Sequence, residues 1–315
     1  MALQSSVADQ PGTCPDCLIV GGGPAGLTAA IYLARFHLRV MVIDAGRSRT
    51  ALIPMTRNHA GFPGGISGAD LLGRMCLQAG EYGVELRHGT VDKLERRCDG
   101  GFLATCDRSP FSSRTVLLAT GVVNRQPAMI DDRTHDLALA GGQLRYCPIC
   151  DGYEVTDRTV AVLGTGHRGF DEALFLRGYT ADVTLIAPET GHDLAAEQQA
   201  TLAAVGIKLA GPCTAIALAG ERILLTLPDA LREFDSLYPA LGSVSQSELA
   251  RNLGAEMSED GCLTVDAHQR TSVAGLYAAG DVVLGLDQIS HAMGEGGVAA
   301  TTIRNDLARQ TPFLR

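Results

Sequence analysis

Short apolar runs alternate along the chain with longer segments that mix apolar and polar residues. The runs at 17–20, 39–43, 115–118 and 159–163 are each followed by glycine, alanine or aspartate. Continuous apolar runs of this length are typical of strands buried inside a parallel sheet, and the segments between them are long enough for the helices that cover such a sheet. The pattern predicts an α/β protein in which strands and helices alternate.

A glycine-rich turn follows the first of these strands. The segment consists, in chain order, of a strand at 17–20, the turn Gly21-Gly22-Gly23-Pro24-Ala25-Gly26, a helix at 27–36, a strand at 39–43 and Asp44. Gly21 permits the tight turn, Gly23 lets the backbone approach a pyrophosphate, and Gly26 lets helix and strand pack closely. The helix N-terminus stabilises phosphate charge, and Asp44 is placed to bind a ribose hydroxyl. This order predicts a dinucleotide-binding half.

The same fingerprint recurs in the middle of the chain. It consists of a strand at 159–163, the turn Gly164-Thr165-Gly166-His167-Arg168-Gly169, a helix at 170–178 and a strand at 182–186. The position that corresponds to Asp44 is Ala187, so this unit lacks the acid. A hairpin at 216–227 and a short strand at 236–242 are expected to close it. The glycines Gly164, Gly166 and Gly169 are therefore a possible second nucleotide site.

Two further strands end in small residues. After the first unit, a glycine- and proline-rich stretch at 58–65 precedes a helix expected at 69–82. Short strands are expected next, at 84–86, 101–105 and 115–118. Near the end of the chain, a strand from 272 precedes a helix expected at 290–307. The strand at 115–118 runs into Ala119-Thr120-Gly121, and the late strand ends in Gly280-Asp281. Such turns beside a glycine loop bring backbone to the same ligand. The last segment is thus expected to return and complete the first domain, with Asp281 reaching the ligand.

The composition narrows the class of protein. A length of 315 residues suits two domains, and the net charge of −9 without a run of five like charges excludes a basic footprint for nucleic acid or anionic membrane. No apolar stretch approaches the roughly 18 residues of a membrane helix, and the polar first thirteen residues lack the features of a secretory signal. Nine cysteines, an odd number, favour a reducing compartment. We expect a soluble cytoplasmic protein that acts on small molecules or proteins.

Two cysteines stand close together in Arg145-Tyr146-Cys147-Pro148-Ile149-Cys150-Asp151-Gly152-Tyr153-Glu154. Thiols at this spacing can form a disulfide, and one thiolate can attack a partner's disulfide while the other resolves the mixed intermediate. Half of a zinc site is the alternative, but its only possible second pair is Cys14 and Cys17, and Cys17 falls where the first strand begins. The sequence favours a redox pair at Cys147 and Cys150 over half of a zinc site and over coincidence. For Cys14 and Cys17 it favours coincidence over a redox relay.

Four features stand together in one order. They are the fingerprint from Gly21, the Ala-Thr-Gly that ends at Gly121, the C-x-x-C-D-G at 147–152 with the second fingerprint behind it, and the Ala-Ala-Gly-Asp that ends at Asp281. In this order they resemble the low-molecular-weight thioredoxin reductase family of flavoenzymes, over the chain from about Cys17. The resemblance implies two Rossmann-like three-layer nucleotide-binding domains, the second inserted into the first, and a homodimer. The implied FAD-binding domain covers 15–126 and 241–315, the pyridine-nucleotide-binding-like domain covers 127–240, and 1–14 is a flexible tail.

The resemblance also implies roles for residues. The implied FAD contacts are Gly21, Gly23, Pro24, Ala25, Gly26, Asp44, Gly121, Gly280, Asp281, Gln288 and Ile289. Cys150 would lie nearer to the flavin, Cys147 would attack the substrate disulfide, and Asp151 would be the acid/base of the exchange. The implied activity is that of a thioredoxin-disulfide reductase, an enzyme that moves electrons between FAD and a thioredoxin-like protein or a small dithiol.

The second unit departs from the family in the residues that choose the nucleotide. Members that use NADPH carry His-Arg-Arg after this strand, because guanidinium groups bind a 2′-phosphate, whereas this chain has Ala187-Pro188-Glu189-Thr190. Asp287 replaces the family's arginine before Gln288, and His167-Arg168 replaces the common Asp-Ser. Glu189 could bind the 2′-hydroxyl of NADH or be a solvated loop charge. The choice between NADH and NADPH is therefore open, and we expect NADPH to bind poorly.

Relatives with such altered sites include ferredoxin-linked reductases and dithiol oxidases that pass electrons from a dithiol through FAD to oxygen. Pro148 after the first cysteine and Tyr153-Glu154 after Asp-Gly resemble those branches. A ferredoxin-linked reductase, a dithiol oxidase and a non-enzymatic flavin sensor are therefore the alternatives. His291, close to the implied flavin contacts, could be an acid/base for a thiol or could bond locally at the start of its helix.

Overall fold

The computed structural model describes residues 14–314, so the predicted tail at 1–14 lies almost wholly outside the described part of the chain. The contacts divide the described chain into two units. Unit 1 comprises residues 14–50, 71–122 and 245–314, and unit 2 comprises residues 51–70 and 123–244. The domain borders expected at 126/127 and 240/241 stay a prediction.

Unit 1 is built on a five-stranded parallel sheet with the strand order β17-β7-β1-β2-β3. The strands are β1 Cys17–Val20, β2 Val40–Asp44, β3 Glu85–His88, β7 Thr115–Leu118 and β17 Leu276–Ala278. Every residue of β1, β7 and β17 is buried, as expected for strands that are covered on both faces. The apolar runs at 17–20 and 115–118 are therefore confirmed as central strands.

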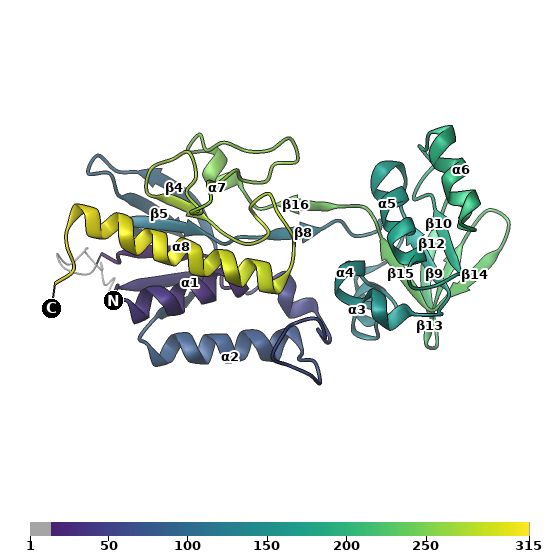
Figure 1. Ribbon diagram of the computed structural model, residues 1–315, viewed down its shortest axis with the longest axis horizontal. Helices are drawn as coiled ribbons and strands as arrows, with labels where there is room; N and C mark the ends of the chain where they lie inside the picture. Colours follow the sequence, from purple (N-terminus) through teal and green to yellow (C-terminus); the bar gives the residue numbers. More distant parts are fainter. Residues whose placement is uncertain (1–13, 315) are drawn as a thin grey trace, which may run out of the picture. The chain divides into compact units, whose positions relative to one another are not determined.

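Helices cover one face of this sheet, and an antiparallel sheet covers the other. In Figure 1, α1 (Pro24–Arg35) and α8 (Ile289–Gln310) lie side by side, and α2 (Gly68–Glu81) lies beyond α1. A side chain at Gly296 would clash with the carbonyl of Ala25, so the two helices pack at glycine distance. The antiparallel sheet consists of β4 (Val91–Arg96), β5 (Phe102–Cys106) and β6 (Ser109–Ser113), and its Phe102 shares a core with Leu18 of β1.

Unit 2 repeats this architecture on a smaller scale. Its parallel sheet has the order β11-β10-β9-β15, and its antiparallel sheet the order β12-β13-β14. The strands are β9 Val160–Leu163, β10 Val183–Ile186, β11 Lys208–Ala210, β15 Ser236–Pro239, β12 Ala215–Ala219, β13 Arg222–Thr226 and β14 Leu231–Phe234. The helices are α3 Asp132–Ala140, α4 Pro148–Asp151, α5 Gly166–Arg177 and α6 Ala196–Ala204, and η2 spans Gly152–Val155. The predicted α/β class with two nucleotide-binding units is confirmed.

Two short paired strands connect the units, β8 (Val122–Asn124) and β16 (Ser243–Ser245). The remaining short elements include η1 Arg49–Leu52, α7 Glu248–Arg251 and isolated bridges such as the one between Thr56 and Ile66. None of the described helices is long and apolar enough to cross a membrane.

The expected helix at 27–36 was wrong at its start, because α1 begins at Pro24. Proline suits the first turn of a helix, where its missing N–H has no partner to lose, but the surrounding glycines hid this start in the sequence. The late strand was expected from 272, yet β17 covers only Leu276–Ala278. The hairpin at 216–227 is confirmed as β12 and β13, with Gly220 in its turn at a positive φ of 63°.

Candidate functional site

The glycine turn of unit 1 has no room for side chains. Gly21 has a φ of 108°, and a Cβ atom there would clash with the carbonyl oxygen of Ala119. A Cβ atom at Gly26 would clash with the carbonyl oxygen of Gly21. Gly23 is the N-cap residue of α1, and no side chain caps the helix there. The first amides of α1 are therefore available to an anionic group, which is what a pyrophosphate requires.

Asp44 closes the same turn from the end of β2. Its Oδ1 accepts a hydrogen bond from the Gly22 N–H (2.9 Å), and its Oδ2 accepts one from the Gly46 N–H (3.1 Å). These two bonds fix the carboxylate beside the glycine turn. A carboxylate at the end of the second strand is the group that binds a ribose hydroxyl in dinucleotide sites, so the turn and its acid fit the adenosine end of FAD.

A charged cluster surrounds Asp281 at the end of β17. Arg49 donates from Nη2 to Oδ2 of Asp281 and from Nη1 to Oδ2 of Asp287, each at 3.2 Å. Burial raises the pKa of Asp281 to about 6, although the charge of Arg49 acts in the opposite direction. The Gly280 N–H donates to Oε2 of Glu295 (2.7 Å). Arg49 and Glu295 were missed in the sequence, because neither belongs to a motif.

The remaining implied flavin contacts of unit 1 lie at the start of α8 and after β7. Gln288 is the N-cap residue of α8 and Ile289 is its first residue. Gly121, after β7, has a φ of 65°. His291 lies one turn before Glu295 and contacts it, with 3.0 Å between Nε2 and Oε1. This local contact matches the second of the two roles considered for His291, and an acid/base role stays a prediction.

In unit 2, Cys147 and Cys150 are joined by a disulfide, with 5.2 Å between their Cα atoms. Cys147 is the N-cap residue of α4, and its Sγ accepts a hydrogen bond from the Cys150 N–H (3.2 Å). Pro148 stands in the first turn of this short helix, where a proline is tolerated. The four-residue turn thus brings the two sulfurs together, as the C-x-x-C spacing indicates.

Asp151 is held beside this disulfide by one partner nearby in the sequence and one distant partner. Its Oδ2 lies 3.0 Å from Nη1 of Arg145, and its Oδ1 accepts a hydrogen bond from the Tyr238 hydroxyl (2.9 Å). Burial raises the pKa of Asp151 above its ordinary value, although Arg145 and the Tyr238 hydroxyl both act to lower it. The carboxyl group is therefore positioned rigidly and holds its proton more tightly than an exposed aspartate.

Glu172 of α5 is a second buried carboxyl group in this region. Its Oε1 is buried and has no hydrogen-bond partner among the described residues. Burial, and then the negative charge of Asp151, raise the pKa of Glu172 to about 7. Tyr238 and Glu172 were missed in the sequence, since both lie far from the cysteines along the chain. The described redox region therefore contains two carboxyl groups with a raised pKa, and that of Glu172 lies near neutral pH.

A second hydrogen-bonded chain fixes the residue before the disulfide. The hydroxyl of Tyr146 lies 3.0 Å from Nε2 of His135, and Nδ1 of that histidine lies 3.0 Å from Oδ1 of Asp136. His135 is buried in α3. This contact ties the redox turn to α3, a helix that was not expected from the sequence.

The second glycine turn has the backbone shape expected of a nucleotide site. However, residues 187–190 after β10, which would distinguish NADPH from NADH, include no basic side chain. Gly166 has a φ of 60°, and a Cβ atom at Gly169 would lie 2.7 Å from the carbonyl carbon of Gly164. Ala187 is buried after β10, and the exposed Glu189 follows it. The guanidinium of Arg168 lies against Gly242, where a Cβ atom would be 2.9 Å from Nη1. The glycines of the second turn are thus in place, but the stretch after β10 lacks the arginines with which the family binds NADPH.

The other C-x-x-C pair is not joined. Cys17 is fully buried in β1, and burial raises the pKa of its thiol to about 12. Cys147–Cys150 is the disulfide within residues 14–314, and no group of three or more potential metal ligands occurs in that part of the chain. A thiol with so high a pKa is a poor nucleophile, so the geometry does not support a relay at Cys14 and Cys17.

Comparisons with known proteins agree with this geometry. The sequence model of the pyridine nucleotide-disulphide oxidoreductase family matches residues 15–296. A thioredoxin reductase of Aquifex aeolicus is 30% identical over 293 residues, which cover 88% of each chain. The structure of a thioredoxin reductase from Streptococcus pyogenes has a TM-score of 0.86 at 25% identity, over 95% of this chain and 100% of that one. The structure of HlmI has a TM-score of 0.88 at 27% identity, over 96% and 95%.

The fold, the dinucleotide turn and the disulfide together define an FAD-dependent disulfide oxidoreductase with a pyridine-nucleotide-type second unit. Within that class, the chain belongs to the low-molecular-weight thioredoxin reductase family. The resemblance seen in the sequence is thereby confirmed.

Proposed function

We propose that this protein moves electrons between FAD and a substrate disulfide or dithiol through Cys147 and Cys150, with a thioredoxin-like protein as the first candidate substrate. The observation that carries the proposal is the disulfide of the α4 turn, with the carboxyl group of Asp151 held beside it. The names of the relatives support the choice of substrate.

The geometry of unit 1 supports the proposed FAD contacts. Gly21, Gly23 and Gly26 would leave room for the pyrophosphate, Asp44 would bind the ribose, and Asp281 would bind the ribityl chain. Pro24, Ala25, Gly121, Gly280, Gln288 and Ile289 complete the proposed contacts. When bound, FAD supplies the two-electron chemistry that the side chains of the protein lack.

The residues of unit 2 handle the thiols and the protons. Reduction of the Cys147–Cys150 disulfide to two thiols takes up two electrons and two protons. Cys147 as a thiolate then attacks the substrate disulfide and forms a mixed disulfide, which Cys150 resolves as it re-forms the internal bond. The released substrate thiolate needs a proton, and Asp151, which directly follows Cys150 and is held by Arg145 and Tyr238, is the proposed proton donor.

We propose that the ordinary NADPH site of the family is lost in unit 2. The stretch from Ala187 to Thr190 carries one negative and no positive charge, so it offers no guanidinium to a 2′-phosphate. NADH, reduced ferredoxin and a dithiol that is oxidised with oxygen as the final acceptor are the remaining electron sources. The oxidase function is the second candidate, and the same missing charges favour it over an NADPH-linked reductase.

One experiment separates these functions. The purified flavoprotein is titrated under anaerobic conditions with NADH, NADPH, reduced ferredoxin and a small dithiol, and flavin absorbance is followed. Reduction by NADH or ferredoxin, with reoxidation by thioredoxin disulfide, is the expected result for a reductase. Reduction by the dithiol alone, with oxygen consumption in air, identifies an oxidase. A protein that none of the four reduces would contradict both functions and leave the flavin sensor.

We further propose a homodimer in the cytoplasm. The seven cysteines besides Cys147 and Cys150 form no disulfide in the described chain, which fits a reducing compartment. Light scattering of the purified protein tests the dimer, and a mass of one chain, 33.1 kDa, would contradict it.

A further inference from the structure

A cleft opens in unit 1 at the amino ends of its parallel strands. It has a volume of about 810 Å³, and its walls include Thr115 and Leu276, the first residues of β7 and β17. The glycine turn follows the carboxyl end of β1, so roughly 13 Å, the length of a four-residue strand, separates the cleft from the turn. The cleft is therefore distinct from the proposed flavin site, and its volume is typical of small-molecule sites.

Arginines dominate the charged lining of this cleft. Arg96, Arg97, Arg114 and Arg270 line it, against two carboxylates, Asp99 and Asp306. The rest of the chain has the opposite balance, since the net charge of the whole protein is −9. Guanidinium groups in a concave site match planar carboxylates and phosphates, because their donors form a rigid fork.

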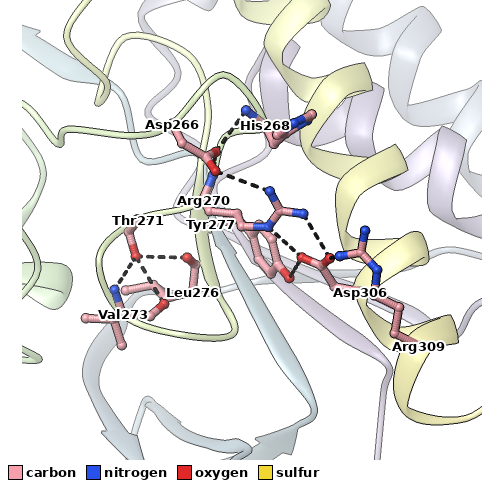
Figure 2. Close-up of polar contacts among 9 residues, drawn as sticks. All are labelled: Asp266, His268, Arg270, Thr271, Val273, Leu276, Tyr277, Asp306 and Arg309. Atoms are coloured by element: carbon pink, nitrogen blue, oxygen red, sulfur yellow. Dashed lines mark hydrogen bonds and ion pairs between the residues drawn. The ribbon is translucent and has the colours of Figure 1, made fainter.

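Arg270 is fixed in place by its acidic neighbours (Figure 2). Its Nε and Nη2 donate to the two oxygens of Asp306 at 2.8 and 2.9 Å, and its Nη1 donates to Asp266 at 3.2 Å. The Tyr277 hydroxyl donates to Asp306 as well (2.9 Å). These bonds use three of the five guanidinium donors and leave two for another acceptor. A pre-oriented arginine with unused donors costs little entropy when it binds an anion.

Two other arginines keep still more donors unused. Arg114 donates from Nη1 to Asp16 (3.0 Å), and its other four donors have no partner among residues 14–314. Arg96 donates from Nη1 to the carbonyl of Ala274 (2.9 Å) and lies over the ring of Phe102, and it has no carboxylate partner among residues 14–314. The charge of Arg96 is therefore not neutralised by any described side chain that it contacts.

The hydroxyl group of Ser113 adds an independent observation. Ser113 lines the cleft from the end of β6 and is only 2% exposed. Its Oγ is buried and has no hydrogen-bond partner within the described chain. A buried hydroxyl without a partner costs free energy in a folded protein, so the Ser113 hydroxyl would gain from a hydrogen bond to a group bound in the cleft.

We propose that this cleft binds a small organic anion that carries phosphate or carboxylate groups, and that Arg96, Arg114, Arg270 and the Ser113 hydroxyl hold it. Such a ligand would contact the start of β17 and the last turns of α8 around Asp306. The C-terminal end of β17 and the N-terminal end of α8 both lead to the charged cluster around Asp281. Occupation of the cleft is therefore expected to stabilise unit 1, and the proposal does not depend on the electron donor or the substrate.

The test is calorimetric titration of the flavin-loaded protein at low ionic strength, with inorganic pyrophosphate and with citrate as separate probes. We expect one site per chain for at least one probe. Arg96→Ala should weaken binding roughly 10- to 100-fold, as expected for the loss of a charge-assisted hydrogen bond. Ser113→Ala should weaken it several-fold without lowering the melting temperature, since its Oγ has no protein partner. Binding of pyrophosphate alone identifies a phosphate ligand, and binding of citrate alone a carboxylate ligand.

Two controls decide whether the anion is in the cleft. Arg133→Ala removes an exposed arginine of α3 in unit 2 and should leave binding unchanged. Arg168→Ala removes the arginine of the second glycine turn. The proposal is overturned if neither probe binds at millimolar concentration, if Arg96→Ala and Ser113→Ala bind as tightly as the parent, or if only Arg168→Ala abolishes binding.

Discussion

The glycine turns of the two units are followed by different residues at the end of the next strand. In unit 1, β2 ends in Asp44, whose carboxylate is fixed by the N–H groups of Gly22 and Gly46. In unit 2, β10 ends before the buried Ala187, and the exposed Glu189 follows. The turn itself depends only on glycines that tolerate close backbone contact, whereas ligand choice depends on the side chains after the strand. A closely packed glycine turn can therefore occur in two units whose residues after the next strand differ in charge.

The largest expected effect concerns what unit 2 has kept, the redox disulfide. Cys147→Ser and Cys150→Ser should each reduce disulfide exchange at least about a thousandfold, because a hydroxyl cannot replace a thiolate as nucleophile or leaving group. Flavin content should stay at one per chain, since both cysteines lie outside unit 1. The measurement is turnover with a protein or small-molecule disulfide beside the flavin absorbance of the same sample. Full turnover by either variant would show that the pair is structural.

The next largest effect concerns the binding of NADPH to unit 2. Without guanidinium partners, each worth roughly 1.5–3 kcal/mol, NADPH should bind weaker than in an ordinary reductase by several powers of ten. NADPH should then be no better than NADH in the rate of anaerobic flavin reduction against nucleotide concentration. Glu189→Arg, which places a guanidinium after β10, should favour NADPH, and Thr190→Ser serves as its control. A micromolar, NADPH-selective response of the parent protein would refute this view of the second turn.

A matched pair of glycine substitutions sharpens the comparison further. A side chain at Gly26 clashes with the Gly21 carbonyl, and one at Gly169 clashes with Gly164. Gly26→Val should weaken FAD binding roughly 10- to 100-fold, for a strain of about 1–3 kcal/mol at the turn. Gly169→Val also strains its turn, with a Cβ atom 2.7 Å from the Gly164 carbonyl carbon, but should leave the flavin bound. Flavin retention after gel filtration measures both, and equal losses would mean that the two turns do not have separate ligands.

The smallest effect concerns the pH dependence of unit 2. The pKa of Glu172 is about 7 in the folded state, above its ordinary value of 4.5. Between these values the folded state binds more protons than the unfolded state, so this group makes stability fall as the pH rises through that window. Glu172→Gln removes the titration and should therefore raise the melting temperature by roughly 2–8 °C at pH 8, for on the order of 1–3 kcal/mol.

The matched control is Glu189→Gln, which removes an exposed carboxylate of the same unit. It should show no such difference. At pH 5, Glu172→Gln and the parent should melt at similar temperatures, because the carboxyl group is then protonated in the folded state. A melting temperature of Glu172→Gln that runs parallel to that of the parent from pH 5 to pH 8 would disprove the assignment.

The sequence by itself determined the parts that depend on local spacing. The strand, the glycine turn and the acid of unit 1 lie within 28 residues of one another, from Cys17 to Asp44. Gly26 is required by its contact with the Gly21 carbonyl inside that span, whereas Gly21 is also required by the carbonyl of the distant Ala119. The same holds for Cys147 and Cys150, whose spacing alone permits the disulfide. The fold class followed from these segments, because apolar runs separated by helical segments form few alternative layers.

Only the tertiary structure decided which distant side chains surround these motifs. Tyr238 reaches Asp151 across 87 positions, and Arg49 reaches Asp287 across 238. The cleft likewise depends on chain folding, since Arg96 at the end of β4 and Arg270, which precedes β17, are brought together only by the folding of unit 1. No pattern of neighbouring residues records such contacts. They arise because burial of apolar strands brings polar side chains together, and those side chains then need partners within reach.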